Sequence, residues 1–412
     1  MLSRVITLRH LVLMLVLCSI AAPLRAASYS YVNISRNIVG YNLGAAAINQ
    51  SGTIAFPLVG PNPDDTKWQA LYLGRGGPPQ KLASRTGWAA RQNSWDPDIN
   101  RNGAVSYWSY TDDPGDGDFD EAALFTASAK GVNTVARYEN AFFTQDAAIN
   151  DKGQIVTVIK WNATDATSVV TYSPKRTVAT FKNPANIFGQ PDINNFGAVV
   201  YPVKVGAEER IIANVGGKQH TIATTKGTNF ASLLDSTPVI NDLGEIAFHA
   251  TLRSPGINGY QGEGIYLFSR DGLRTIVENT SIFERFGGFS INNRGQVVFM
   301  AFRAPGFGDE GIFAGPDPLA DCVICDGDLL NGETVLSLNL ASHALNDAGQ
   351  VAFHAYLTAG RESVFRADPI SLATAAAVPT AAAPEPSTLL LLGIACAPFL
   401  LARWRLRAAS CV

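Results

Sequence analysis

The chain has 412 residues, with 32 Lys and Arg against 35 Asp and Glu, five cysteines and a formal net charge of −3. This balance argues against a nucleic-acid-binding protein, because such binding depends on basic side chains that neutralise phosphates. The length exceeds what one simple hydrophobic core usually supports, so several domains or a repeat architecture are expected.

The N-terminus has the organisation of a secretory signal peptide. Arg4 and Arg9 precede an apolar stretch at 11–22, and the small residues at 26–28 offer a cleavage site. We expect residues 1–26 to be removed and the rest to be exported. Without this signal and the C-terminal tail, which together hold six arginines and one glutamate, 26 basic and 34 acidic residues remain. The exported core is therefore acidic, at about −8, which argues against anionic lipid as well as nucleic acid.

One motif recurs seven times along the exported core, with the form Ile-Asn-x-x-Gly-x-(Ile/Val)-x-(aromatic). The copies read INQSGTIAF from Ile48, INRNGAVSY from Ile99, INDKGQIVT from Ile149, INNFGAVVY from Ile193, INDLGEIAF from Ile240, INNRGQVVF from Ile291 and LNDAGQVAF from Leu345. Successive copies lie 44 to 54 residues apart. A period of this size indicates a repeat architecture.

The motif has the chemistry of a tight turn that joins two strands. Its Asn can cap the turn through the side chain, and its Gly can take the positive φ that closes it. The alternating apolar residues that follow have the period of a strand, so each copy predicts the tip of a β-hairpin. The predicted turn residues are Asn49 and Gly52, Asn100 and Gly103, Asn150 and Gly153, Asn194 and Gly197, Asn241 and Gly244, Asn292 and Gly295, and Asn346 and Gly349.

Two more apolar stretches follow each hairpin, as at 264–268 and 274–277. Four short strands per repeat make one blade, so we predict an all-β fold: a seven-bladed β-propeller of four-stranded blades over residues 28–370. The seventh repeat lacks a last strand, and residues 29–35 form an unassigned β-rich segment, so the N-terminal strand should close the ring. A right-handed β-solenoid is the rival, but its coils are usually shorter.

An acidic, glycine-rich loop at 112–121 lies between predicted strands of the second blade. Alternate carboxylates at Asp112, Asp116, Asp118 and Asp120 suit Ca²⁺, a hard cation that takes six to eight oxygen ligands. The loop lacks the distal glutamate of an EF-hand, and a solvated acidic loop is the alternative. Apart from this Ca²⁺, no cofactor is expected.

His249 and His354 share one repeat position, eight residues after the motif Asn. Equivalent positions can converge on one face of a propeller, so a two-histidine metal or acid–base site is one interpretation. The two belong to non-adjacent blades, and other repeats fill the position mostly with apolar residues. We therefore favour a structural role for both.

Cys322 and Cys325 are the only cysteines outside the signal and the tail. In an oxidising compartment such a pair favours a local disulfide. A redox motif should open a helix after a strand, whereas the aspartates around this pair indicate a loop. A zinc site would need two further ligands.

The C-terminus combines a linker with a tripartite tail. Residues 371–383 are rich in Ala, Thr and Pro and indicate a flexible spacer. Pro384, Glu385 and Pro386 follow, then an apolar run at 387–402, then Arg403, Arg405 and Arg407. The run is shorter than the roughly 20 residues of a spanning helix, but snorkelling arginines and an interfacial Trp404 extend it. Because arginines lie on one side of the apolar run only, we expect the C-terminus to be cytoplasmic and the chain before Pro384 to lie outside. A buried helix of a soluble domain is the alternative.

Residues 384–407 resemble the PEP-CTERM sorting signal of Gram-negative surface proteins. The resemblance implies processing by an exosortase-type peptidase, anchoring in the inner membrane through a C-terminal single membrane helix, and delivery to the cell surface or the extracellular space, with a link to exopolysaccharide.

These observations lead us to expect a non-catalytic binding or structural module, with exopolysaccharide or surface proteins as partners and no catalytic residues. Nucleophile elbows, zincin motifs, phosphate loops and dinucleotide-binding glycine patterns do not occur in the sequence. The first alternative is a propeller enzyme acting on polysaccharide or peptide, which requires carboxylates or histidines at one mouth of the channel. A redox protein using Cys322 and Cys325 is the second.

Overall fold

The computed structural model describes residues 28–36, 38, 43–61, 67–85, 96–111, 121–164, 166–182, 187, 189–233, 237–279, 282–304, 310–358 and 360–370. The predicted signal peptide, the acidic loop at 112–120, the linker and the tail with its expected membrane helix lie outside these residues. Within the described ranges, the structure contains no helix that is both long and apolar enough to cross a membrane.

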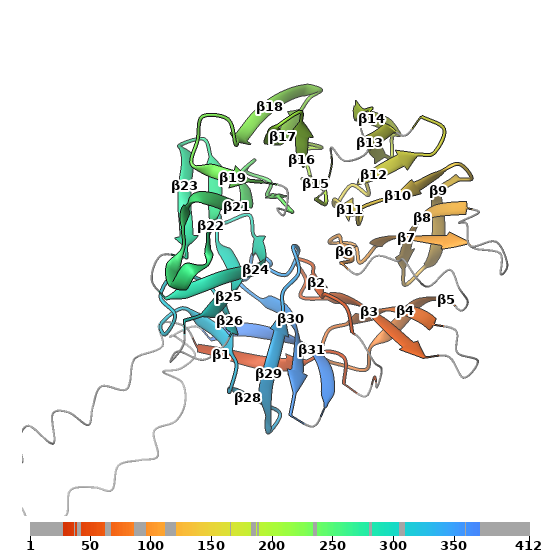
Figure 1. The fold of residues 1–412 in the computed structure, drawn as a ribbon. Coiled ribbons are helices and arrows are strands. Elements are labelled where there is room, and N and C mark those ends of the chain that lie inside the picture. Colours follow the sequence, from red (N-terminus) through yellow and green to blue (C-terminus); the bar gives the residue numbers. More distant parts are fainter. Residues whose placement is uncertain are drawn as a thin grey trace, which may run out of the picture. The chain divides into compact units, whose positions relative to one another are not determined.

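Seven antiparallel sheets follow one another around a ring, as Figure 1 shows. The predicted all-β, seven-bladed propeller is therefore confirmed. The first blade runs from the channel outward as β2 (Ala47–Ile48), β3 (Ile54–Pro61), β4 (Lys67–Gly74) and β5 (Gln80–Arg85). The second is β6 (Asp98–Ile99), β7 (Val105–Thr111), β8 (Glu121–Ser128) and β9 (Gly131–Tyr138).

In blades three and five the inner strand is divided in two, whereas blade four has a single inner strand. Blade three contains β10 (Ala141–Phe143), β11 (Ala148–Ile149), β12 (Ile155–Trp161), β13 (Ala166–Tyr172) and β14 (Arg176–Phe181). Blade four contains β15 (Asp192–Ile193), β16 (Val199–Val205), β17 (Glu208–Val215) and β18 (Lys218–Thr224). Blade five contains β19 (Phe230–Ser232), β20 (Val239–Ile240), β21 (Ile246–Pro255), β22 (Gln261–Ser269) and β23 (Gly272–Glu278), with a 3-10 turn at Ile257–Gly259.

The last two blades complete the ring. Blade six contains β24 (Phe283–Ile291), β25 (Val297–Arg303), β26 (Glu310–Phe313) and β27 (Cys322–Cys325). Blade seven contains β28 (Leu329–Leu330), β29 (Glu333–Asn339), β30 (Val351–Leu357), β31 (Arg361–Ile370) and the N-terminal β1 (Ser28–Asn33).

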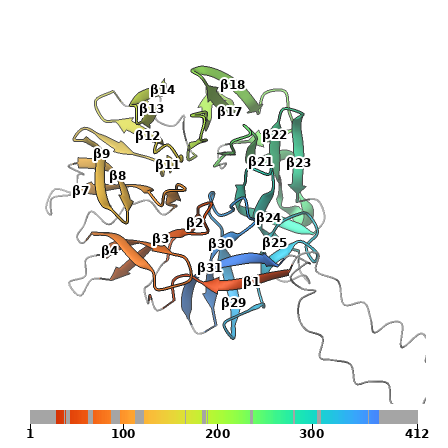
Figure 2. The same ribbon diagram turned by 180° about the vertical axis from the view of Figure 1, so that it is seen from behind.

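The N-terminal strand closes the propeller as its sequence predicts. β1 lies at the outer edge of blade seven and pairs with β31 from the other end of the domain, which Figure 2 shows from behind. Just beyond β1, the Ile34 amide donates to the Val364 carbonyl at 2.8 Å, and the Val364 amide donates to Ser35 Oγ at 3.1 Å. The first and last strands therefore share one sheet, which joins the two ends of the ring.

The core lies between neighbouring blades because the second strand of each blade is buried on both faces. Val156 and Val158 of β12 share one apolar cluster with Val199 and Tyr201 of β16. The same arrangement joins blades four and five through Val200 and other residues. This packing explains why the motif continues into a nearly uninterrupted apolar run.

One local prediction was wrong: the Cys-x-x-Cys segment is a strand and not a loop. Cys322 and Cys325 begin and end β27, the outer strand of blade six, and both are buried. The structure joins them by a disulfide with an S–S distance of 2.11 Å. The flanking aspartates act as turn residues at the ends of the strand, since Asp328 Oδ2 accepts from the Cys325 amide at 2.9 Å.

Candidate functional site

The seven motif asparagines form a closed ring of hydrogen bonds around the channel. Each Nδ2 donates to the backbone carbonyl of the motif Asn in the next blade, at 2.9 to 3.2 Å. The seventh bond, from Asn346 to Asn49, returns to the first blade. The motif therefore joins all the blades at one mouth of the channel, in addition to turning each hairpin.

The same side chains also hold their own turns. Asn194 Oδ1 accepts from the amides of Phe196 and Ala198, both at 3.0 Å, and the other six asparagines make the equivalent pair of bonds. The turn glycines have φ between +70° and +79°, the left-handed region expected for them. Each Asn thus has its carbonyl oxygen committed to its own turn and its amide group committed to a neighbour.

A second ring, one residue further along, forms the rim of this mouth. Its members are Gln50, Arg101, Asp151, Asn195, Asp242, Asn293 and Asp347. In six blades the backbone amide at this position donates to the side chain of the next blade's member. The seventh bond, from Gln50 to Arg101, cannot form because a guanidinium group has no acceptor. Arg101 instead pairs with Asp151 at 2.7 Å.

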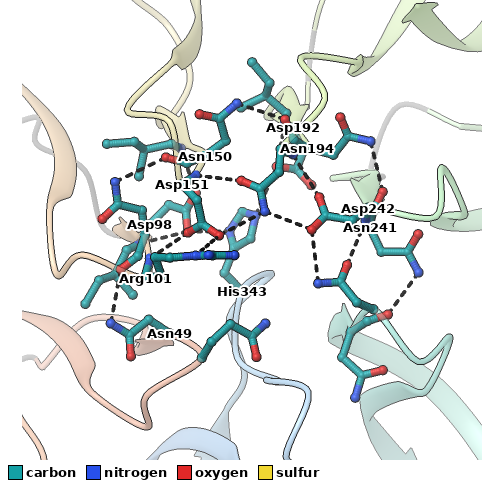
Figure 3. A pocket seen from close by; sticks show the side chains of 18 of the residues that line it. Asn49, Asp98, Arg101, Asn150, Asp151, Asp192, Asn194, Asn241, Asp242 and His343 are labelled. Atoms are coloured by element: carbon teal, nitrogen blue, oxygen red, sulfur yellow. Dashed lines mark hydrogen bonds and ion pairs between the residues drawn. The ribbon is translucent and has the colours of Figure 1, made fainter.

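A buried ionic group lies below the ring, as Figure 3 shows, with His343 at its centre. His343 Nε2 lies 3.1 Å from Asp192 Oδ1, and its Nδ1 lies 3.7 Å from Asp98 Oδ1. These residues line a cavity of about 130 Å³ together with six of the seven motif asparagines. They come from blades seven, four and two, so side chains distant in sequence meet on the channel axis.

The two aspartates also bind backbone amides of neighbouring blades. Asp98 Oδ2 accepts from the Ile149 amide at 2.7 Å, and Asp192 Oδ2 accepts from the Ile240 amide at 2.8 Å. The His343 carbonyl accepts from the Ile48 amide at 2.9 Å. The ionic group is therefore bonded to six of the seven blades.

The charges of this group determine its protonation. Burial would lower the pKa of His343, but Asp98, Asp192 and Asp96 raise it to about 10. Burial raises the pKa of Asp98 to about 6, against the opposing effect of His343. At neutral pH we therefore assign an imidazolium between carboxylates.

This protonation predicts that stability falls as pH rises above neutrality. The folded pKa of His343 lies above the unfolded value of about 6.5, so its contribution is complete below that pH and is lost as pH rises through about 10. We expect the free energy of unfolding to fall by about 3.5 kcal/mol between pH 7 and pH 10, given these two pKa values. Urea unfolding at several pH values measures this loss. In H343Q the free energy of unfolding should change little between pH 7 and pH 10. If it fell equally in H343Q and in the wild type, His343 would not be the group that carries the proton.

A second cavity, of about 500 Å³, lies at the other end of the inner strands. Its lining includes Asp96, Thr237, Gly288 and Ser342, each of which stands four residues before the motif Asn of its blade. Ser342 Oγ donates to Asp96 Oδ2 at 2.9 Å and lies 3.4 Å from His343 Nδ1. Asp96 and Ser342 therefore connect this cavity to His343 through polar contacts.

The structure separates the two histidines that share a repeat position. His249 Nε2 lies 3.0 Å from Glu263 Oε2 at the second cavity. His354 is buried in blade seven, with Nε2 at 3.4 Å from Glu362 Oε2. They therefore do not form a joint site. In the part of the chain that the structure describes, no three His, Cys, Asp or Glu side chains form a metal-site cluster.

The sequence analysis did not identify the three residues of the ionic group. Asp98 and Asp192 stand two residues before the motif Asn, and His343 stands three before it. Aligning the repeats by their asparagines could have shown these polar positions in otherwise apolar inner strands.

Comparison with solved structures supports the fold alone. The β-propeller domain of the Trilobed protease from Pyrococcus furiosus aligns with a TM-score of 0.52 at 10% identity, over 80% of this chain and 98% of that chain. An acylaminoacyl peptidase from Pyrococcus horikoshii gives 0.48 at 11% identity, over 78% of this chain but only 52% of the peptidase, about half its length. TolB from Acinetobacter baumannii gives 0.40 at 9% identity, over 80% of this chain and 63% of that chain.

No curated protein matches the sequence significantly. Residues 26–379, which include the whole propeller, match the DUF7453 family, a family of unknown function, and the chain therefore belongs to that family.

Proposed function

We propose that this protein is an exported, non-catalytic propeller that acts as a binding or structural module of the cell surface or the exopolysaccharide layer. The observation that carries the proposal is the tail at 384–407, with its Pro-Glu-Pro tripeptide, apolar run and arginines. An exosortase-type peptidase would process this tail after the membrane segment has held the chain. The predicted signal peptide at 1–26 and the acidic exported core are consistent with a protein of the cell surface.

The chemistry of the channel supports a non-catalytic role. Every motif Asn is engaged in holding its turn and the next blade, so these amides are not free to act on a substrate. The imidazolium of His343 lies between Asp98 and Asp192, and an imidazole that stays protonated at neutral pH cannot act as a general base.

The tail predicts a specific sorting defect. We expect E385A/P386A to stay in the membrane, since the tripeptide is the recognition element in this proposal. Protease treatment of intact cells, followed by immunoblotting, measures surface exposure. T380A, in the adjacent linker, is the matched control and should reach the surface like the wild type. Equal surface exposure of both variants would refute sorting through this tail.

A propeller enzyme acting on polysaccharide or peptide is the second candidate. Ionisable side chains at a mouth of the channel favour it, since Asp96, His249 and Glu263 line the second cavity. Release of reducing ends or free amines from such polymers by the wild type, and not by D96N, would support the enzyme over the binding module.

A further inference from the structure

One half of the face that carries the asparagine ring presents an apolar pair between two cations. The position two residues after the motif Asn holds Lys152, Phe196, Leu243 and Arg294 in blades three to six. Phe196 is 76% exposed and Leu243 is 68% exposed, which makes them the two most exposed large apolar side chains among the described residues. Lys152 and Arg294 are exposed as well. We call these four side chains the turn patch.

Contacts between neighbouring turns hold the turn patch together. Asn195 donates to Asp242 from its backbone amide at 2.9 Å and from its side chain at 2.8 Å, so the turns of blades four and five touch. Lys152 Nζ lies 5.9 Å from the centre of the Phe196 ring. Side chains at this position therefore reach those of the next blade, and the four form one continuous surface.

The cations of the turn patch are available to a partner. Within the described residues, Lys152 and Arg294 form no ion pair, whereas the rim carboxylates of Asp151 and Asp242 are already hydrogen-bonded. The fold does not require apolar side chains at this position. The other three blades have Ser51, Asn102 and Ala348 there. An exposed apolar pair between two cations thus indicates a partner segment that is both apolar and acidic.

The chain itself supplies such a segment between β7 and β8. Residues 112–120 contain five aspartates, one aromatic residue, Phe119, and no Lys or Arg. Blade four joins its equivalent strands through only two residues, 206–207, so the propeller does not need so long a connection. Its charge and its aromatic side chain complement the turn patch.

This acidic loop belongs to the opposite face of the propeller. β7 starts beside the motif turn at 100–103, and at its other end Thr111 pairs with Glu121, where the loop begins and ends. The seven residues of β7 span about 23 Å, and a nine-residue loop that must return to its start reaches about 18 Å at most. The loop therefore cannot reach the turn patch of its own chain.

We propose that the acidic loop of one copy docks on the turn patch of a second copy. Phe119 packs against Phe196 and Leu243, and the aspartates lie beside the two cations. Because the two surfaces lie on opposite faces, the contact is heterologous, and its repetition joins copies head to tail. This self-association goes beyond the proposed function and does not depend on how the protein is sorted.

The test is photo-crosslinking between two differently tagged full-length chains made in the same cells. One chain carries p-benzoyl-L-phenylalanine in place of Phe196, and the lysate contains a chelator, so that Ca²⁺ does not occupy the loop. Irradiation should join this chain to the second one, and mass spectrometry should place the link within residues 112–120. The same crosslinker in place of Leu329, which is 66% exposed on blade seven, is the matched control and should give no such product.

Changes to the second chain and to the buffer test the role of charge. D116N/D118N/D120N removes three of the five loop carboxylates and should lower the crosslinking yield about tenfold. Raising the salt concentration from about 50 mM to about 500 mM should also lower the yield, because exposed charges are screened.

Several results would overturn the inference. They are the absence of a crosslinked dimer, links only to other parts of the second chain, to lipid or to another protein, and an unchanged yield with D116N/D118N/D120N. None of them affects the proposed function, which surface exposure of the protein decides. Retention of the protein in the cytoplasm would instead refute the proposed function and leave the crosslinking result standing.

Discussion

Replacing His343 with alanine is expected to lower the free energy of unfolding by about 3 kcal/mol at pH 7. The substitution removes the cation between Asp98 and Asp192 and leaves two buried carboxylates without their common partner. We expect the lower end of the range for broken buried pairs, because 21% of the imidazole surface is exposed. Urea unfolding followed by circular dichroism measures the change.

Two further variants separate the charge effect from simple truncation. H220A removes a histidine from an exposed position of β18 and should stay within about 0.5 kcal/mol of the wild type. H343K should lose less stability than H343A, because it keeps a positive charge between Asp98 and Asp192. The charge assignment would be wrong if H343A unfolded like the wild type, or if H343K were no more stable than H343A.

Replacing Asn194 with alanine is expected to cost about 3 kcal/mol, because it removes three hydrogen bonds at once. The amides of Phe196 and Ala198 lose their acceptor, and the carbonyl of Asn241 loses one of its two donors, keeping only the amide of its own turn glycine. Each bond to a buried group contributes about 1 kcal/mol. Asn194 is a suitable position because the residue four places on is Ala198, whereas Gln154 or Gln350 accepts from the Asn amide in other blades.

The two roles of this side chain can be measured separately. N194D keeps both acceptor bonds within the turn but places a carboxylate oxygen against the Asn241 carbonyl, so we expect a loss at least as large as that of N194A, about 3 kcal/mol. F196A, in the same turn, removes a side chain that is 76% exposed and should be nearly neutral. Chemical denaturation of the three variants tests the prediction. Equal stability of N194A and F196A would mean that the asparagine ring does not hold the blades together.

The repeat made the fold predictable, because its period and turn chemistry both appear in the sequence. Seven Asn-x-x-Gly turns gave the number of blades, and the missing last strand of the seventh repeat indicated that the N-terminal segment closes the ring. The strand character of Cys322–Cys325 was missed because the flanking aspartates resemble a loop, although they stand at the ends of β27.

The candidate site was much less predictable. The turn chemistry explains why each motif Asn caps its own hairpin, but its bond to the next blade depends on how neighbouring blades are placed. Asp98, Asp192 and His343 meet on the channel axis only because the ring brings blades two, four and seven together. Single residues separated by 94 to 245 positions carry no local pattern that reveals such a meeting.

The central claim, that this propeller is exported and sorted through its tail, is tested most directly by the intact mass and cellular location of the mature protein, with and without an active exosortase. We predict that the peptidase-containing strain yields a surface protein that lacks the signal peptide and the segment after Pro386, while the deletion strain retains the tail in the membrane. An intact tail that stays in the membrane in both strains would contradict the claim and indicate a plain C-terminal anchor.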